Sequence, residues 1–277
     1  MWQEGIVETA RGSFEIFEKG QGEPLAVTHL YSEFNQKGNQ MAAAFSNDYH
    51  VYLINLRGAG RSAKANESEE YSMDETVKDL EAIRKALKLE KWAFAGHSTG
   101  GMLALKYAIN QPESLTKIIV GGAAASKEYG RDKHSIYCKE NPHYSRVIEI
   151  MTLLNHPETP HEIRQDVNYE WAKLSYHTEE KLKESMKKPN SGKVVGPRLD
   201  YFIKTESPNY DIRKELKAIR IPSFIYSGKF DAQCPLKFGE EIAELIPTAK
   251  LTVFEESNHN PFAEEENKFR EFVKNTI

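Results

Sequence analysis

Short apolar runs alternate with helical segments along most of this chain, and this alternation limits the possible folds more than any other feature. Six runs, each bounded by turn residues, have the length and composition of buried strands: residues 25–28, 51–54, 92–95, 118–120, 223–226 and 251–254. Before them, residues 5–10 and 14–18 alternate in the manner of paired strands, with Arg11-Gly12 as the turn.

Helical periodicity occupies several of the intervals between these runs. In the clearest segment, 72–87, apolar side chains recur at helical spacing, and Ser72 stands three residues before Glu75, which predicts a capping box. Segments 101–110, 236–245 and 264–273 are the other helical candidates. Strands that alternate with helices predict an α/β fold, with a mostly parallel sheet covered by helices on both faces.

The alternation stops between residue 123 and about residue 217. This stretch is polar and helix-like, and it holds seven of the 13 tyrosines: Tyr129, Tyr137, Tyr144, Tyr169, Tyr176, Tyr201 and Tyr210. We interpret it as an insertion of helices placed over the end of the sheet. The alternative is a pair of ordinary helical layers within the same domain.

Composition excludes several classes of protein. The 277 residues carry a formal charge of −4, which gives no reason to expect nucleic acid or an anionic membrane as partner. The longest nearly apolar run, 118–125, is too short to cross a bilayer, and the first residues lack the pattern of a secretory signal. Two cysteines, Cys138 and Cys234, make a disulfide framework unexpected. We therefore expect a cytoplasmic protein that acts on a small molecule; its oligomeric state stays open.

The sequence Gly-His-Ser-Thr-Gly at residues 96–100 lies directly between a predicted strand and a predicted helix. In that context the pattern is typical of a nucleophile on a sharp strand-to-helix turn, with the helix N-terminus aimed at a developing oxyanion. A glycine-rich turn with an incidental serine is the plainer alternative. Two nucleotide-binding interpretations fail, because no periodic helix follows residues 58–63 and Met102 replaces the lysine of a phosphate loop.

A nucleophilic Ser98 needs a base and an acid that orients the base. His259 follows the last predicted strand, whereas five other downstream histidines, at 134, 143, 156, 161 and 177, lie in the insertion. Asp231 follows the preceding strand, and residues 121–125 offer no carboxylate in its place. The order Ser98, Asp231, His259 is the order of nucleophile, acid and base in α/β-hydrolases. No Cys/His spacing indicates a metal, and no cofactor is expected.

These residues identify a resemblance to the α/β-hydrolase superfamily over nearly the whole chain, and residues 56–62 (Leu-Arg-Gly-Ala-Gly-Arg-Ser) match its usual loop after the fourth strand. The resemblance implies a mostly parallel eight-stranded sheet with a helical cap inserted after the sixth strand. It also implies a core of residues 1–122 and 217–277 and a cap of residues 123–216. Proline iminopeptidases, C–C bond hydrolases and small carboxylesterases share this layout.

The chain departs from the family at the oxyanion hole. The usual His-Gly is His29-Leu30 here, and alignment gives the N–H groups of Tyr31 and Thr99 as the two donors. Because Leu30 cannot adopt dihedrals reserved for glycine without strain, the local path is expected to differ. The elbow also lacks the Gly-Gly-Ser-Trp-Gly that is common in iminopeptidases.

The predicted function is hydrolysis of a small carboxylic ester or related acyl compound through an acyl-enzyme. Tyrosines of the insertion, Tyr137, Tyr144, Tyr169 and Tyr176, are predicted to line the pocket, because ligands of open α/β sheets bind at the carboxyl end of the strands. One alternative is an aminopeptidase, in which a cap carboxylate such as Glu170 or Glu206 binds the ammonium group. Another is a ligand-binding protein without turnover.

Overall fold

Eight strands form one sheet in the computed structural model, which describes residues 1–156 and 158–277. The order is β1-β2-β5-β3-β6-β7-β9-β10, and the pairs are parallel except β1–β2 and β2–β5. The bounds are β1 Gln3–Thr9, β2 Gly12–Lys19, β3 Glu23–Thr28, β5 Tyr49–Ile54, β6 Trp92–His97, β7 Leu115–Gly121, β9 Ser223–Gly228 and β10 Ala249–Phe254. The predicted α/β fold with a mostly parallel eight-stranded sheet is confirmed.

Helices connect these strands and form the insertion. Those around the sheet are α1 Gln40–Phe45, α2 Met73–Ala86, α3 Thr99–Asn110, α8 Arg213–Leu216, α9 Leu236–Leu245, α10 Pro261–Glu264 and α11 Glu266–Lys274. Those of the insertion are α4 Tyr144–Asn155, α5 His161–Lys173, α6 Glu179–Met186 and α7 Gly196–Tyr201. Short 3₁₀ turns (η1 Ser68–Tyr71, η2 Pro112–Ser114, η3 Lys127–Arg131, η5 Ser207–Asn209) and one π-helical turn (η4 Phe202–Glu206) complete the order.

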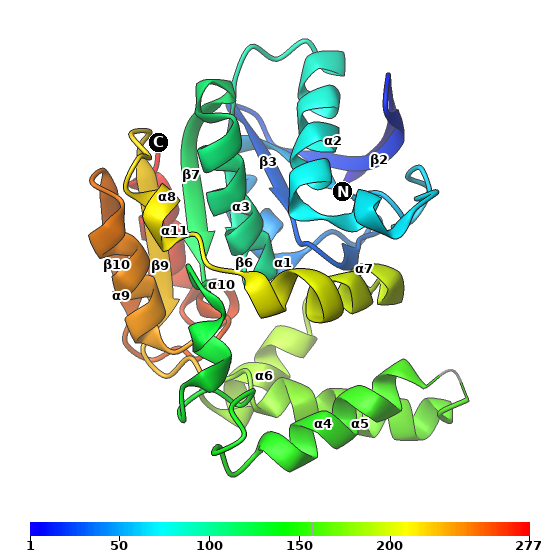
Figure 1. The fold of residues 1–277 in the computed structure, drawn as a ribbon, viewed down its shortest axis with the longest axis vertical. Helices are drawn as coiled ribbons and strands as arrows, with labels where there is room; N and C mark the ends of the chain where they lie inside the picture. Colours follow the sequence, from blue (N-terminus) through cyan, green and yellow to red (C-terminus); the bar gives the residue numbers. More distant parts are fainter. Residues whose placement is uncertain (157) are drawn as a thin grey trace.

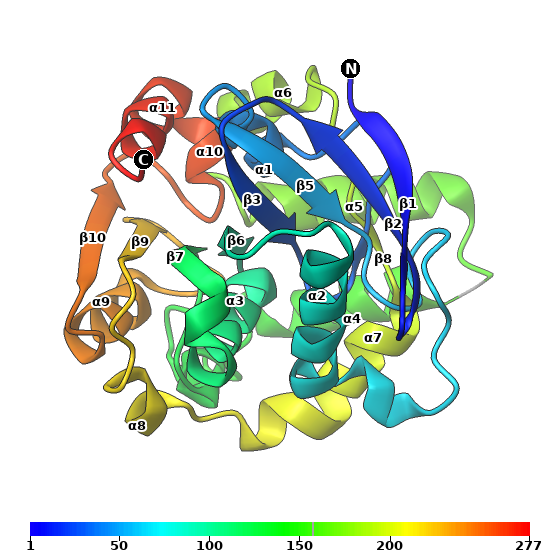
Figure 2. The ribbon, with the colours of Figure 1, turned by 90° about the horizontal axis from the view of Figure 1, so that it is seen from above.

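The sheet separates two apolar cores because successive side chains of a strand point to opposite faces. In β6, Trp92 and Phe94 pack with α2, α3 and α9, whereas Ala93 and Ala95 pack with α1 and α11. Figure 2 shows α2 and α3 on one side of the strands and α1 and α11 on the other. Helices on both faces are therefore confirmed, and the carboxyl ends of the parallel strands are left for the insertion.

Two helical predictions need correction in detail. The Ser72 hydroxyl accepts the N–H of Glu75 at 3.2 Å, but the Glu75 carboxylate binds Arg11 and Lys78, so only half of the predicted capping box forms. The helix predicted at 264–273 begins two residues later, as α11 at Glu266, because Glu265 leaves helical geometry at φ −133° and ψ 55° and separates α11 from the short helix α10.

The insertion leaves the sheet after β7, its sixth strand along the chain, and returns before β9. Figure 1 shows α4, α5 and α6 together at one end of the molecule. A two-stranded sheet of β4 (Ser32–Glu33) and β8 (Lys193–Val194) ties the insertion to the loop after β3. The fold thus has the predicted helical insertion, while the boundaries at residues 123 and 216 stay a prediction. Within the described part of the chain, none of the helices combines the length and apolar character needed to cross a membrane.

Candidate active site

Ser98 occupies the single residue between β6 and α3, in a strained conformation with φ 56° and ψ −127°. Its N–H donates to the Gly121 carbonyl at 2.8 Å, which holds the turn against the end of β7. The turn is tight: a Cβ at Gly96 would lie 1.9 Å from the Gly100 carbonyl oxygen. Ser98 is half-buried, although His97 and Thr99 on either side of it are buried. A strained, accessible hydroxyl at a helix N-terminus suits a nucleophile.

Asp231 and His259 form a buried pair at the ends of β9 and β10. Asp231 Oδ2 lies 2.8 Å from His259 Nδ1, and the two residues are only 4% and 5% exposed. The second carboxylate oxygen of Asp231 accepts the N–H groups of Gln233 (2.9 Å) and Cys234 (2.8 Å). With both oxygens bonded, the carboxylate is fixed in the position that orients the imidazole.

The imidazole of His259 lies beside the serine turn. Its ring centroid is 4.5 Å from that of His97, the residue before Ser98. It also packs on Gly122, where φ is +51° and a Cβ would lie 2.9 Å from His259 Cε1. Gly122 follows the residue that holds the Ser98 N–H, so the structure brings the three predicted triad residues to one place.

Two further histidines flank this site, and burial keeps both neutral. Burial lowers the pKa of His29 to about 3, with smaller effects of His259 and Arg198. Burial also lowers the pKa of His97 well below its usual value, helped by His259 and His29. His29 and His97 therefore add no charge beside His259 at neutral pH.

The predicted oxyanion loop, His29-Leu30-Tyr31, is held by its side chains. His29 Nε2 lies 3.1 Å from Thr99 Oγ1, and His29 Nδ1 lies 2.9 Å from Ser32 Oγ. Leu30 is not among the described non-glycine residues with positive φ, and it is buried in the core. Thr99 is the first residue of α3, where the backbone N–H has no acceptor within the helix. The Tyr31 N–H has a weak contact, 3.5 Å from His29 Nδ1.

The four tyrosines predicted for the pocket have different neighbours. Tyr137 donates to Gln233 Oε1 at 2.7 Å, two residues past Asp231, and its ring lies 6.1 Å from that of Trp171. The Tyr169 hydroxyl binds Glu179 and that of Tyr176 binds Ser185, both within the insertion. Tyr144 is half-buried at the start of α4. The structure thus links Tyr137 to the triad loops, and a pocket role for the other three stays a prediction.

The turn that follows α5 is bonded to the loops of Asp231 and His259 through residues that sequence reasoning missed. The Ser175 carbonyl accepts the N–H of His259 at 3.1 Å, and its hydroxyl accepts Gln233 Nε2 at 2.7 Å. Asn258 donates to the Leu174 carbonyl at 3.0 Å and accepts the N–H of Ala232 at 2.8 Å. Asn258 and Gln233 are neighbours of predicted residues, which is the one sequence signal that pointed to them.

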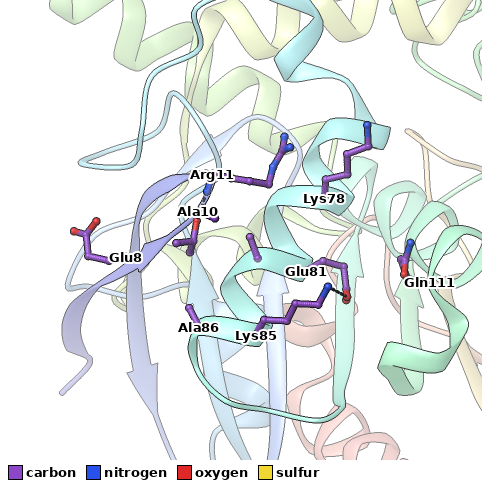
Figure 3. Close-up of a pocket in the computed structure, with 10 residues that line it drawn as sticks. Glu8, Ala10, Arg11, Lys78, Glu81, Lys85, Ala86 and Gln111 are labelled. Atoms are coloured by element: carbon purple, nitrogen blue, oxygen red, sulfur yellow. Dashed lines mark hydrogen bonds and ion pairs between the residues drawn. The ribbon is translucent and has the colours of Figure 1, made fainter.

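A cavity of about 720 Å³ lies elsewhere, between the first hairpin and α2, and Figure 3 shows its lining. None of the predicted site residues lines it. Its Arg11 pairs with Glu75 and Asp79, and its Lys78 pairs with Glu75, so these cations are already neutralised. This cavity offers no competing centre for the chemistry. The described residues also contain no group of three histidine, cysteine, aspartate or glutamate side chains that could hold a metal ion.

Comparison with known proteins places this geometry in a family. The sequence model of the alpha/beta hydrolase fold matches residues 27–266. A proline iminopeptidase of Heyndrickxia coagulans is 26% identical over 289 residues, which cover 97% of this chain and 96% of that protein. An alpha/beta fold family hydrolase from Bacillus anthracis str. Sterne has a solved structure with 58% identity, a TM-score of 0.99 and full coverage of both chains. An esterase from Exiguobacterium antarcticum, with 23% identity, a TM-score of 0.74 and 99% coverage of both chains, shows the same fold. The chain therefore belongs to the alpha/beta hydrolase fold family and is a hydrolase.

Proposed function

We propose that this protein is a serine hydrolase that cleaves a small carboxylic ester or related acyl compound in the cytoplasm. Ser98 Oγ attacks the acyl carbon while His259 takes its proton, and His259 then protonates the leaving group and activates water. Asp231 holds the imidazole and stabilises its protonated form. The N–H groups of Thr99 and Tyr31 receive the oxyanion. The Asp231–His259 pair beside a strained serine turn is the observation that carries this proposal.

Aromatic side chains next to the triad loops support a compact substrate. Tyr137 lies between Tyr129 and Trp171, at ring distances of 6.2 and 6.1 Å. Burial raises the pKa of Tyr137, so its hydroxyl stays protonated and keeps its hydrogen bond to Gln233 Oε1. Tyrosines present an apolar body with a polar tip, which suits a short or aromatic acyl group. We expect such esters to be hydrolysed faster than esters with chains of about twelve carbons.

An aminopeptidase is the second candidate, and the similarity to a proline iminopeptidase favours it. That activity needs a carboxylate for the substrate ammonium. Glu170 is bound by Arg146 through both oxygens, at 2.8 and 2.6 Å. Glu206 accepts the N–H of Met73 with one oxygen, while its other oxygen is buried without a partner in the described structure. Of these two carboxylates, only Glu206 keeps an oxygen for an ammonium group, and ester hydrolysis is the better supported proposal.

Two assays test the proposal. Short p-nitrophenyl esters and amino-acid p-nitroanilides, compared at equal enzyme concentration, separate the esterase from the aminopeptidase. Intact-mass analysis after treatment with a fluorophosphonate should show one adduct, on Ser98. Ser98→Ala should lose the adduct and reduce kcat on the order of 10⁶-fold. Ser145→Ala, on an exposed position of α4, is the matched control. A Ser98→Ala enzyme that keeps more than about a tenth of the activity would contradict the proposal, and no turnover of any ester or anilide would favour a binding protein.

A further inference from the structure

Arg198 is a buried guanidinium that the proposed reaction does not use. It lies on α7 of the insertion and is 1% exposed. Its Nε donates to the Leu30 carbonyl, its Nη1 to the Arg57 carbonyl at 3.0 Å, and its Nη2 to Thr76 Oγ1 at 2.7 Å. All three acceptors are uncharged oxygens, the guanidinium lies 5.5 Å from the centre of the Tyr71 ring, and the carboxylates of Asp79 and Glu206 act on it without a hydrogen bond. A buried cation that binds no carboxylate directly is costly, so this contact set calls for a reason beyond packing.

The first of these acceptors belongs to the oxyanion loop. The Leu30–Tyr31 peptide is trans, since the described residues contain no cis bond, and in a trans peptide the C=O and N–H point in opposite directions. By holding the Leu30 carbonyl, Arg198 turns the Tyr31 N–H to the opposite side of that peptide, where its contact with His29 Nδ1, at 3.5 Å, is weak enough for an oxyanion to replace it. The Tyr31 carbonyl is held as well, by the N–H of Val195 at 2.8 Å. Both peptide groups of the loop are thus fixed by residues 195–198.

The departure at Leu30 explains why the loop needs this support. Where the family usually has glycine, backbone freedom lets the peptide adopt the donor orientation. Leu30 has a side chain that is buried in the core, and its φ is not positive. Its backbone therefore lacks the freedom that a glycine would have. The charge of Arg198 also reaches the site, because it contributes to the lowered pKa of His29.

We propose that Arg198 is a positioning residue for the oxyanion hole: it fixes the Leu30–Tyr31 peptide so that the Tyr31 N–H faces the developing oxyanion, and its positive charge favours that oxyanion. This inference rests on the proposed serine-hydrolase function. It makes the insertion part of the transition-state machinery rather than a cover over the pocket.

Kinetics of two variants separate orientation from charge. Arg198→Met removes both, and kcat for a short p-nitrophenyl ester should fall about 100-fold, which is typical of a lost oxyanion donor, with KM changed less than about threefold. Arg198→Lys keeps the charge without the three-pronged contact, and its loss should be about tenfold. Arg84→Lys is the matched control, because Arg84 is also buried and also binds two backbone carbonyls, those of Leu89 and Glu90. It should stay within about twofold of wild type.

A spectroscopic measurement needs no turnover. Leu-Tyr occurs once in the sequence, at residues 30–31, so ¹³C-carbonyl leucine with ¹⁵N tyrosine gives a single correlation from this peptide. In Arg198→Met both shifts of that correlation should move. A small alkyl boronic acid should bind Ser98, because boron takes an electron pair from Ser98 Oγ, whose proton passes to His259. The tetrahedral adduct carries a negative charge, so in wild type it should shift the signal of the Tyr31 amide. In Arg198→Met this response should be lost.

The outcomes distinguish the inference from the proposed function. A folded Arg198→Met protein with an unchanged peptide correlation, or with kcat within threefold of wild type, overturns the role of Arg198. If Arg198→Met does not fold, Arg198→Lys decides by the same two measurements. Active Ser98→Ala, or a wild-type protein without any boronic acid response, overturns the serine mechanism instead, while the peptide correlation still reports whether Arg198 orients the loop.

Discussion

Asp231 shows how much of the proposed chemistry depends on one carboxylate. Its Oδ2 lies 2.8 Å from His259 Nδ1, so the pair selects the tautomer in which Nε2 is free to accept the proton of Ser98. Asp231→Asn should keep the shape of the site but select the wrong tautomer of His259. As a result, kcat should fall by roughly 10⁴. Asp200→Asn, which removes only an exposed pair with Lys204, is the control. A loss of less than tenfold in Asp231→Asn, measured with a p-nitrophenyl ester, would assign the acid elsewhere.

The three clustered histidines predict a simple pH profile. The folded-state pKa of His29 is lowered to about 3 and that of His97 well below its ordinary value, so both rings stay neutral as the pH falls through 6. His29 and His97 should therefore contribute no ionisation of their own to the activity profile in mild acid. Because the proposed base must be neutral to accept the Ser98 proton, kcat/KM should fall on the acid side by tenfold per pH unit, with a single ionisation. A slope of two in the plot of log kcat/KM against pH, or a flat profile down to pH 5 in folded protein, would contradict a single histidine base.

Sequence reasoning reached the residues whose positions the fold determines and missed those that depend on packing across the insertion. Ser98, Asp231 and His259 follow strands in a fixed order, so counting strands was enough to bring them together. Arg198 lies 167 positions after Tyr31 and has no sequence signal of its burial, because arginines are usually exposed. Its contact with Leu30 depends on the pairing of β4 with β8, which brings the insertion to the loop after β3. This pairing could not be predicted from the sequence.

At the scale of elements, the turn that follows α5 is the link between the insertion and the proposed triad residues Asp231 and His259. Ser175 binds the His259 loop with its carbonyl and the Asp231 loop with its hydroxyl, through Gln233. The same Gln233 accepts the Tyr137 hydroxyl at 2.7 Å. Tyr137 therefore shares a hydrogen-bond partner, Gln233, with Ser175, whose carbonyl accepts the N–H of His259. This arrangement predicts that the tyrosines of the insertion differ in their effect on substrate preference.

Tyr137→Ala and Tyr169→Ala form a matched pair for this expectation. Tyr137 contacts the triad loop, whereas the Tyr169 hydroxyl binds Glu179 at 2.8 Å on the insertion itself. Tyr137→Ala should change the ratio of kcat/KM between an aromatic and a short aliphatic ester by about tenfold, as expected for one pocket contact. Tyr169→Ala should leave the ratio within about twofold. If both changes alter the ratio about tenfold, with both proteins folded, Tyr169 lines the pocket as well. If neither does, the pocket does not lie beside Tyr137.

At the scale of the whole molecule, the sheet was predictable because each buried strand is a short apolar run with turn residues at both ends. Residues 92–95 and 118–120 were recognised in this way and lie inside β6 and β7. Helix ends were less predictable, since they depend on competing partners. The Glu75 carboxylate binds Arg11 of the distant β1–β2 turn rather than its own helix end. Tertiary contacts of this kind have no signature in a local window of sequence.

Half-buried His29 and buried His97 should also make the whole fold sensitive to mild acid. The pKa of His29 and of His97 lies far below the value of about 6.5 expected in the unfolded chain. As the pH falls below 6.5, the unfolded chain binds protons that the folded protein does not, and each histidine costs up to about 1.4 kcal/mol of stability per pH unit. Glu206 and Glu264 act in the opposite direction, because burial raises their pKa and the folded protein binds their protons first.

Urea unfolding at pH 7.0 and 5.5 measures this balance. Between the two values each of the two histidines should lower the free energy of unfolding by about 1 kcal/mol, while Glu206 and Glu264 offset part of this loss. His97→Gln removes one of the two histidines, so its loss should be about 1 kcal/mol smaller than that of wild type, whatever its stability at pH 7.0. His161→Gln, at an exposed position of α5, should behave as wild type. The same loss between pH 7.0 and 5.5 in His97→Gln and in wild type would show that His97 accepts a proton within the fold, and that the neutral imidazole cluster around Ser98 does not exist.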